Sequence, residues 1–385
     1  MAGLAEDQSV GLQGCRLMKP INHLLARLHA CQTARDRAGN RKLFFDQYVA
    51  LLLLYFFTPP LESLRALQQA TNWKRIQRKL GLSRTSLGSL SEASRVFDAE
   101  LLRRILQELA SQALPLVQGE EAQLLRGLTA VDGTIFRGVS QMAWALWQDE
   151  KHRGLKLHLQ FDLLKSVPVD AVISPAACSE PKHLIENLAA HRLYVTDGGY
   201  FQYDLLAAIL QAGSSFVARV NPQMAYYAQE ERTLSEAALQ AGVIRDAILS
   251  RVGVKKIKKA IDQPLRLVVV KTVDRVGVPI ELWLLTDRLD LPAELIALAY
   301  QYRWLIELFF RWMKSVLKAR HLIAHSANGV ALQMYAALIV SLLIVLDTHR
   351  KPNRRIYEAI QFYRLGWVSD EELDAAIASQ PEIKA

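Results

Sequence analysis

The stretch that decides the fold is LYVTDGGYF, residues 193–201. Its first four residues are aliphatic, aromatic or β-branched and predict a short buried strand, and the Asp-Gly-Gly that follows predicts a turn. A helical pattern of leucines begins at Leu205. A strand that leads through an acidic turn into a helix is typical of an α/β sheet, in which ligands bind at the carboxyl ends of the strands. Asp197 is therefore a candidate site residue.

A second stretch, GLTAVDGT at residues 127–134, has the same form. Its apolar run ends in Asp132 and Gly133, so we expect Asp132 to be exposed where a strand ends, at the edge of a sheet. Asp-Gly pairs are common in turns and at helix N-termini. For either aspartate alone, that structural role is the simpler interpretation.

The segments around these two stretches predict a mixed α/β sheet. Residues 154–162 alternate between polar and apolar side chains, and residues 167–173 are rich in β-branched ones, as in the two strands of a hairpin. A helical pattern at 182–190 and a strand at 215–220 follow. The order is three strands, helix, strand, helix and strand, which favours a mixed sheet.

Residues 221–290 change in character and predict a β-rich insertion, with strands at 265–273 and 280–286. Trp283 in this insertion and Trp304 after it are candidates for stacking on an unpaired base, because an indole face accepts any base. The alternative is that both tryptophans fill the core between the insertion and the helix that follows.

Residues 300–314 read YQYRWLIELFFRWMK and predict an amphipathic helix. At about 100° per residue, Tyr300, Arg303, Glu307 and Lys314 fall within roughly 60° of arc. Glu307 on this face could hold a metal ion while the two cations hold phosphate oxygens. The alternative is an ordinary solvated face of a helix.

Together the three acids predict a site that none of them predicts alone. Asp132 and Asp197 at the ends of two strands, and Glu307 on a later helix, can converge on a pair of divalent ions, as two-metal phosphoryl transfer requires. Mg²⁺ is the expected ion because it prefers oxygen ligands and keeps several waters. The sequence has no cluster of His and Cys with zinc spacing.

With these motifs the sequence resembles bacterial insertion-sequence transposases of the DDE type, in the group with the YREK signature, also called insertion sequence family four. Asp132-Gly-Thr looks like the first catalytic block and Asp197-Gly-Gly-Tyr-Phe like the second. Tyr300, Arg303, Glu307 and Lys314 match Y-(2)-R-(3)-E-(6)-K without a gap. The chain departs from the pattern at Gly198, where the family commonly has a basic residue.

The resemblance implies a fold, an activity and a set of partners. It implies an RNase H-like core, two Mg²⁺ ions held by Asp132, Asp197 and Glu307, with Mn²⁺ able to substitute, and strand cleavage followed by strand transfer in cut-and-paste DNA transposition. It implies that Tyr300, Arg303 and Lys314 contact phosphates of the transposon ends, and that a homodimer forms on double-stranded DNA. A nuclease of the same fold without strand transfer, and an inactive DNA-binding derivative, are the alternatives.

The N-terminal region is helical in pattern and locally basic. Residues 71–104 carry eight Lys or Arg against three acids, and Gly81 and Ser83 predict a turn and an N-cap between two helices. From Ser89 a capping-box spacing predicts one helix through Leu106. This segment is the expected DNA-end reader, of helix-turn-helix type, and the alternative is a bundle with a solvated basic face. The lysine run at 255–259 is a second DNA contact or a polar loop.

These patterns predict an α/β protein with a helical N-terminal domain. The expected boundaries are 1–121 for a helical DNA-binding domain, 122–220 and 291–368 for a split catalytic core, 221–290 for the insertion and 369–385 for a C-terminal tail.

The formal net charge of +9 favours polyanionic partners. Residues 330–346 carry no charge, and a membrane helix is the alternative to a buried core helix, but Gln333, Tyr335 and Ser341 interrupt the run. We therefore expect no membrane partner. The absence of a leader pattern and three scattered cysteines predict the bacterial cytoplasm, in association with the nucleoid.

Overall fold

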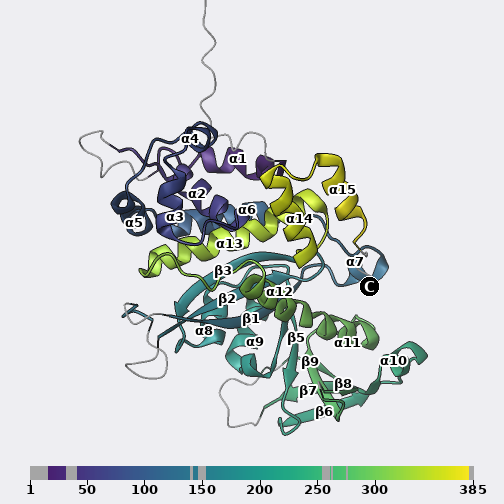
Figure 1. The fold of residues 1–385 in the computed structure, drawn as a ribbon. Helices are drawn as coiled ribbons and strands as arrows, with labels where there is room; N and C mark the ends of the chain where they lie inside the picture. Colours follow the sequence, from purple (N-terminus) through teal and green to yellow (C-terminus); the bar gives the residue numbers. More distant parts are fainter. Residues whose placement is uncertain are drawn as a thin grey trace, which may run out of the picture.

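The computed structural model describes residues 16–31, 41–138, 142–145, 153–253, 261, 263–274 and 276–380. The lysine run at 255–259 lies outside these residues. In Figure 1 a large central sheet separates a layer of helices from the N- and C-terminal parts of the chain, above it, from two shorter helices below. The mixed α/β architecture predicted from the sequence is confirmed.

The sheet has nine strands in the order β3-β2-β1-β4-β5-β9-β8-β7-β6. Parallel pairing joins β1 to β4 and β4 to β5, and the other neighbours are antiparallel. The strands are β1 (Leu128–Arg137), β2 (Gly154–Asp162), β3 (Val167–Pro175), β4 (Leu193–Thr196), β5 (Ser215–Val220), β6 (Tyr226–Glu231), β7 (Val243–Val252), β8 (Leu265–Val273) and β9 (Pro279–Thr286).

The β-rich segment 221–290 continues the sheet rather than forming a second one. Its last strand, β9, pairs antiparallel with β5, with Val217 opposite Thr286. The short helix α10 (Glu236–Gln240) joins β6 to β7 at the far end. All nine strands therefore share one continuous hydrogen-bonded ladder.

Helices α8 (Glu180–Glu186) and α9 (Tyr203–Gln211) cover one face of the sheet. The prediction of a helix over 182–190 is wrong at both ends. Pro181 in the first turn fixes the early start. Beyond Asn187 the backbone of Ala189 bonds to the hydroxyls of Tyr194 and Ser214 instead of continuing the helix.

Helices of the N- and C-terminal regions cover the other face, and the longest is α13 (Ala327–Thr348). Among the described residues it is the one helix long and apolar enough to cross a membrane, but 89% of that window is buried inside the protein. It packs against α6, α2 and β3, and Tyr335 donates a hydrogen bond to the carbonyl of Ala171 on β3. Its all-round apolar surface is explained by burial on all sides.

The described residues form further helical elements. They are η1 (Arg16–Met18), α1 (Lys19–Ala26), α2 (Phe45–Phe57), α3 (Leu64–Ala70), α4 (Lys74–Leu80), α5 (Leu87–Val96), α6 (Ala99–Gln112), α7 (Glu120–Leu124), η3 (Gly198–Tyr200), α11 (Ala293–Tyr302), α12 (Trp304–Ser315), α14 (Arg354–Leu365) and α15 (Asp370–Ala378).

The basic segment differs in detail from the prediction of one helix through Leu106. Two helices form, because Ser86 rather than Ser83 caps α5 by accepting from the Ser89 amide at 3.0 Å, and Asp98 starts a new helix by accepting from the Glu100 amide. Both are side-chain caps of the kind that fix a helix start. The chain turns between them at Phe97.

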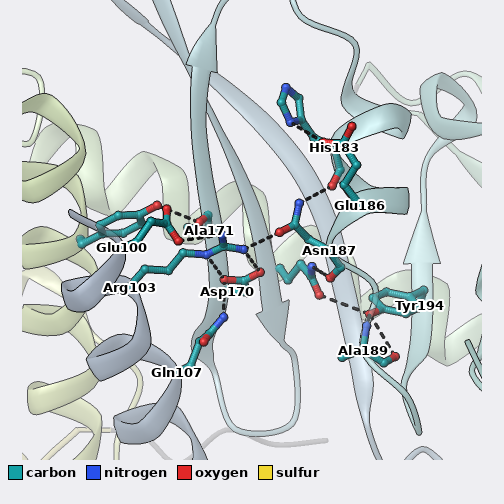
Figure 2. Close-up of polar contacts among 12 residues, drawn as sticks. Glu100, Arg103, Gln107, Asp170, Ala171, His183, Glu186, Asn187, Ala189 and Tyr194 are labelled. Carbon is teal, nitrogen blue, oxygen red and sulfur yellow. Dashed lines mark hydrogen bonds and ion pairs between the residues drawn. The ribbon is translucent and has the colours of Figure 1, made fainter. Parts of the chain in front are cut away.

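A buried ion pair joins the helical layer to the sheet (Figure 2). Arg103 on α6 donates two hydrogen bonds of 2.7 Å to Asp170 on β3, and a third of 2.6 Å to the Asn187 side chain. Gln107, one turn further along α6, also donates to Asp170 at 2.9 Å. Because every partner is satisfied, this pair fixes how α6 lies across the sheet.

Arg103→Met should lower the free energy of unfolding by about 3 kcal/mol, because Asp170 would keep its burial but lose its cation. Urea unfolding of the full chain measures this. Arg27→Met is the matched control, since Arg27 pairs with Glu108 on the same helix α6 at an exposed position, and it should cost less than about 1 kcal/mol. Equal losses for the two variants would contradict the inference.

Candidate active site

Asp132 lies in the middle of β1, not at its end. β1 pairs with β4 only from Leu128 to Ala130, but its pairing with the longer β2 continues to Arg137. The expectation of an exposed aspartate at a sheet edge is therefore wrong, because β1 continues beyond Asp132 in its pairing with β2. The Asp132 side chain is 20% exposed. Asp132 stands where the parallel pairing stops and the sheet opens.

Asp197 follows β4 directly, one strand away from Asp132. Its carboxylate accepts a hydrogen bond of 3.0 Å from the Gly199 amide and so caps η3. This is the turn role that the Asp-Gly pair predicts. The negative charge of Asp197 also acts on Asp132, whose pKa it raises.

Burial is the main cause that raises the pKa of Asp132 to about 7, and the charges of Asp197 and Glu180 add to it. The Gly133 amide, which donates at 2.7 Å, and Arg303 oppose the shift. Glu180, at the start of α8, was not foreseen from the sequence, since Ser-Glu-Pro there predicts only a helix N-terminus. It also pairs with Lys156 at 3.0 Å.

Glu307 lies on α12. Residues 300–314 do not form the single amphipathic helix that the sequence predicts. A break at Arg303 separates α11 from α12. Arg303 bonds its own amide to the Tyr300 carbonyl, three residues back, which tightens the last turn of α11. Arg303 and Glu307 nevertheless stay on the same side, four residues apart.

The Arg303 guanidinium lies between the two acids that α12 and β1 contribute. One of its nitrogens donates to Glu307 at 2.6 Å, and another lies 3.9 Å from the Asp132 carboxylate. The structure thus brings Asp132 and Glu307 to one shared cation. Asp197 joins them through its electrostatic effect on Asp132.

The chemistry of these donors fits a hard divalent cation, because all are carboxylate oxygens. Their side chains are not arranged as a metal site. Among the residues that the structure describes, no three His, Cys, Asp or Glu side chains are grouped to hold a metal ion. Arg303 instead supplies the positive charge between Asp132 and Glu307. A bound metal ion would have to displace that guanidinium.

Lys314 connects α12 back to β1. Its ammonium donates to the Thr134 hydroxyl at 2.6 Å and the Ile135 carbonyl at 2.8 Å, and lies 4.9 Å from the centre of the Phe136 ring. Burial is the main cause that lowers the pKa of Lys314. Lys314 therefore anchors the strand that carries Asp132.

A cleft of about 740 Å³ opens beside the acids, between α11–α12 and strands β8–β9. Tyr300 and Trp304 line it together with Arg303 and Glu307. The buried hydroxyl of Tyr300 has no hydrogen-bond partner among the described residues. Arg311 approaches the Trp304 ring at 6.0 Å.

Trp283 lies apart from this cleft. Its neighbours Leu282 and Leu284 line the cleft, so the alternation along β9 turns Trp283 to the opposite face of the sheet. There it packs near the Tyr226 ring and donates to Glu281 at 3.2 Å. The structure does not bring the two candidate tryptophans together.

Comparison with known proteins assigns a family to the central part of the chain. Residues 124–343 match the family described as the transposase DDE domain, which is more than half of the chain. A Sinorhizobium fredii (strain NBRC 101917 / NGR234) protein named as a transposase, y4zB, is 32% identical over 197 residues, which are 50% of this chain and 53% of that protein. The chain therefore spans about half the length of this relative.

A second relative aligns with more of the chain. A Geobacillus stearothermophilus protein, named as a transposase for insertion sequence element IS5377, is 25% identical over 288 residues, which are 74% of each chain. Both relatives carry the word transposase in their names.

Arg303→Gln should bind Mn²⁺ in the absence of DNA roughly tenfold more tightly than the wild type, because the competing guanidinium is removed from Glu307. Isothermal titration calorimetry measures this. Arg311→Gln removes the same charge from the same helix without freeing Glu307, and should leave the affinity unchanged. Equal gains in both variants would mean that net charge alone is responsible.

Asp132→Asn should stabilise the metal-free protein at alkaline pH. Because the folded-state pKa of Asp132 is raised to about 7, its stabilising contribution is full below the unfolded-state pKa of about 4 and is lost as the pH rises from there to about 7. With EDTA at about pH 8 the variant should melt at least roughly 2 °C higher than the wild type, and at about pH 5 the gain should be less than about half as large. A gain of the same size at both pH values would contradict the assignment.

Proposed function

We propose that this chain, which belongs to the transposase DDE domain family, is the DNA transposase of an insertion sequence. It binds the ends of its element and catalyses metal-dependent strand cleavage and strand transfer, as in cut-and-paste transposition. The observation that carries the proposal is the meeting of Asp132 and Glu307 at Arg303, beside Asp197, within the matched residues. Glu307 and Arg303 also line the open cleft.

We also propose that the chain belongs to the YREK-signature group, insertion sequence family four, with an RNase H-like core. The uninterrupted spacing of Tyr300, Arg303, Glu307 and Lys314 supports the group. The order β3-β2-β1-β4-β5, with β4 and β5 parallel to β1, supports the core. The insertion at 221–290 then separates the second acid from the third in sequence.

Proteins with this domain generally use divalent metal ions. In our proposal Asp132, Asp197 and Glu307 hold two Mg²⁺ ions, or Mn²⁺ in their place, and the bound ions supply Lewis-acid stabilisation at the reacting phosphate. On DNA binding, the Arg303 guanidinium releases Glu307 and binds a phosphate oxygen of the DNA instead. Its planar fork suits either anion, so the exchange replaces one anionic partner with another.

Further side chains support the DNA strand in this proposal. Lys314 has three N–H donors and uses two within the chain, so one remains for a phosphate oxygen. The Tyr300 hydroxyl donates to the strand, and Trp304 in the cleft offers its ring to a base. Trp283 would reach an unpaired base only from the opposite face of the sheet.

We propose that each segment of the chain has its own role. Residues 1–121 bind double-stranded DNA, residues 122–220 and 291–368 form the catalytic core, residues 221–290 form the insertion and residues 369–385 the tail. A homodimer on DNA pairs the two transposon ends, and the protein works in the bacterial cytoplasm at the nucleoid.

Asp132→Ala, Asp197→Ala and Glu307→Ala should each lose at least roughly 100-fold in Mg²⁺-dependent cleavage and keep DNA binding, because each removes a metal ligand and leaves the helical region intact. The substrate is a labelled duplex that carries the DNA flanking the gene. Gel assays of nicking and joining measure the reaction, with the exposed Glu236→Gln as control.

Full nicking by any of the three alanine variants would refute the assignment of that residue. Cleavage by the wild type without any joined product would identify a nuclease instead of a transposase.

A further inference from the structure

The connected helices α4 and α5 lie at the outer side of the helical layer (Figure 1). Trp73, at the start of α4, is 68% exposed. Five cations near it are also exposed, and they are Lys74, Arg75, Arg78, Lys79 and Arg84. We call these six residues the α4 surface.

None of these five cations forms an ion pair within the part of the chain that the structure describes. α4 itself contains no acid, and Ile76 and Leu80 face inward. The four cations of α4 recur at positions i, i+1, i+4 and i+5, so they share one side of the helix. This positive charge has no acidic partner within the described part of the chain, so it suits an external anion.

The α4 surface is held rigidly from beneath. Gly81 ends α4 in the left-handed conformation at φ 59°, and its carbonyl accepts from the Gln47 side chain of the buried helix α2. The Thr71 hydroxyl accepts from the Thr85 amide at 3.1 Å, and Gln77 donates to the Thr71 carbonyl at 2.8 Å. The turn between the helices is therefore closed by side-chain bonds and is preorganised for a rigid partner.

We propose that the α4 surface binds the sugar–phosphate backbone of duplex DNA. The proposal rests on the proposed function for its choice of polyanion. The cations neutralise successive phosphates, and the Trp73 indole packs on the apolar face of a deoxyribose while its N–H donates to a phosphate oxygen. The Trp73 indole supplies contact area that lysines and arginines alone do not. The count of charged residues over 71–104 did not identify this tryptophan.

A fixed link connects this surface to the catalytic sheet. At the end of α5 the Asn328 side chain donates to the carbonyls of Ser94 and Phe97 at 2.9 and 2.6 Å and accepts from the Ala99 amide at 3.1 Å. Asn328 belongs to α13, which packs on β3. DNA held at α4 thus has a defined position relative to the strands that carry the acids.

The test measures binding of the full chain to a short fluorescein-labelled duplex of mixed sequence, by anisotropy over a series of NaCl concentrations. Trp73→Ala should weaken binding roughly fivefold or more. The double variant Arg75→Gln and Arg78→Gln should lower the slope of log affinity against log salt by about 1.8. Each change is at an exposed position, so folding should be retained and is checked by thermal unfolding.

Matched controls exist on other faces of the chain. Trp367 is 72% exposed on the loop after α14, and Lys182 and Arg355 are exposed cations on α8 and α14. Trp367→Ala, and Lys182→Gln combined with Arg355→Gln, should leave both affinity and salt slope unchanged. Equal effects of test and control variants would overturn the proposal, because the surface would then contribute only through net charge.

Two further arms separate this proposal from the proposed function. If Trp73→Ala loses binding to vesicles of phosphatidylserine and phosphatidylcholine but not to DNA, the surface meets a membrane and the proposal is overturned. If wild-type protein cleaves and joins DNA but the α4 variants bind it normally, the α4 assignment falls and the transposase stands. If the α4 variants lose binding while the wild type never cleaves, the surface assignment stands and the transposase falls.

Discussion

The parallel pairing of β1 with β4 is the constraint on which the rest of the site depends. Two parallel strands end at the same edge, so Asp197 after β4 lies beside Asp132 on β1. Because β2 prolongs β1 beyond that point, Asp132 is held by strand pairing on one side and open on the other. The aspartate is thereby fixed in position but poorly hydrated, which is why burial dominates its pKa.

Such a gathering of acids needs a positive charge, and the chain supplies one. Arg303 at the break between α11 and α12 reaches both Glu307 and Asp132. Two carboxylates in a partly buried place would otherwise repel each other and favour protonation. The same guanidinium that offsets this repulsion is thus an obstacle to a metal ion, and a phosphate group is an alternative partner that can draw it away.

Local sequence patterns predicted most of the sheet. The strands at 154–162, 215–220 and 265–273 are confirmed to the residue, because alternation and β-branching are properties of each segment alone. The identities of the acids came from motif spacing. The mid-strand position of Asp132 depends on the unequal lengths of β2 and β4, and the role of Glu180 depends on α8 packing over β1, so neither is encoded in a local pattern. The same holds for the pair of Arg103 with Asp170, which are far apart in sequence.

The direct ladder between β5 and β9 limits how the molecule can move. A segment attached by flexible linkers could close over a bound strand. A segment that is hydrogen-bonded into the central sheet can only twist together with that sheet. The strands β7 and β6 lie farthest from β1 in this sheet. The central sheet therefore acts as a rigid support for the acids that β1 and β4 position.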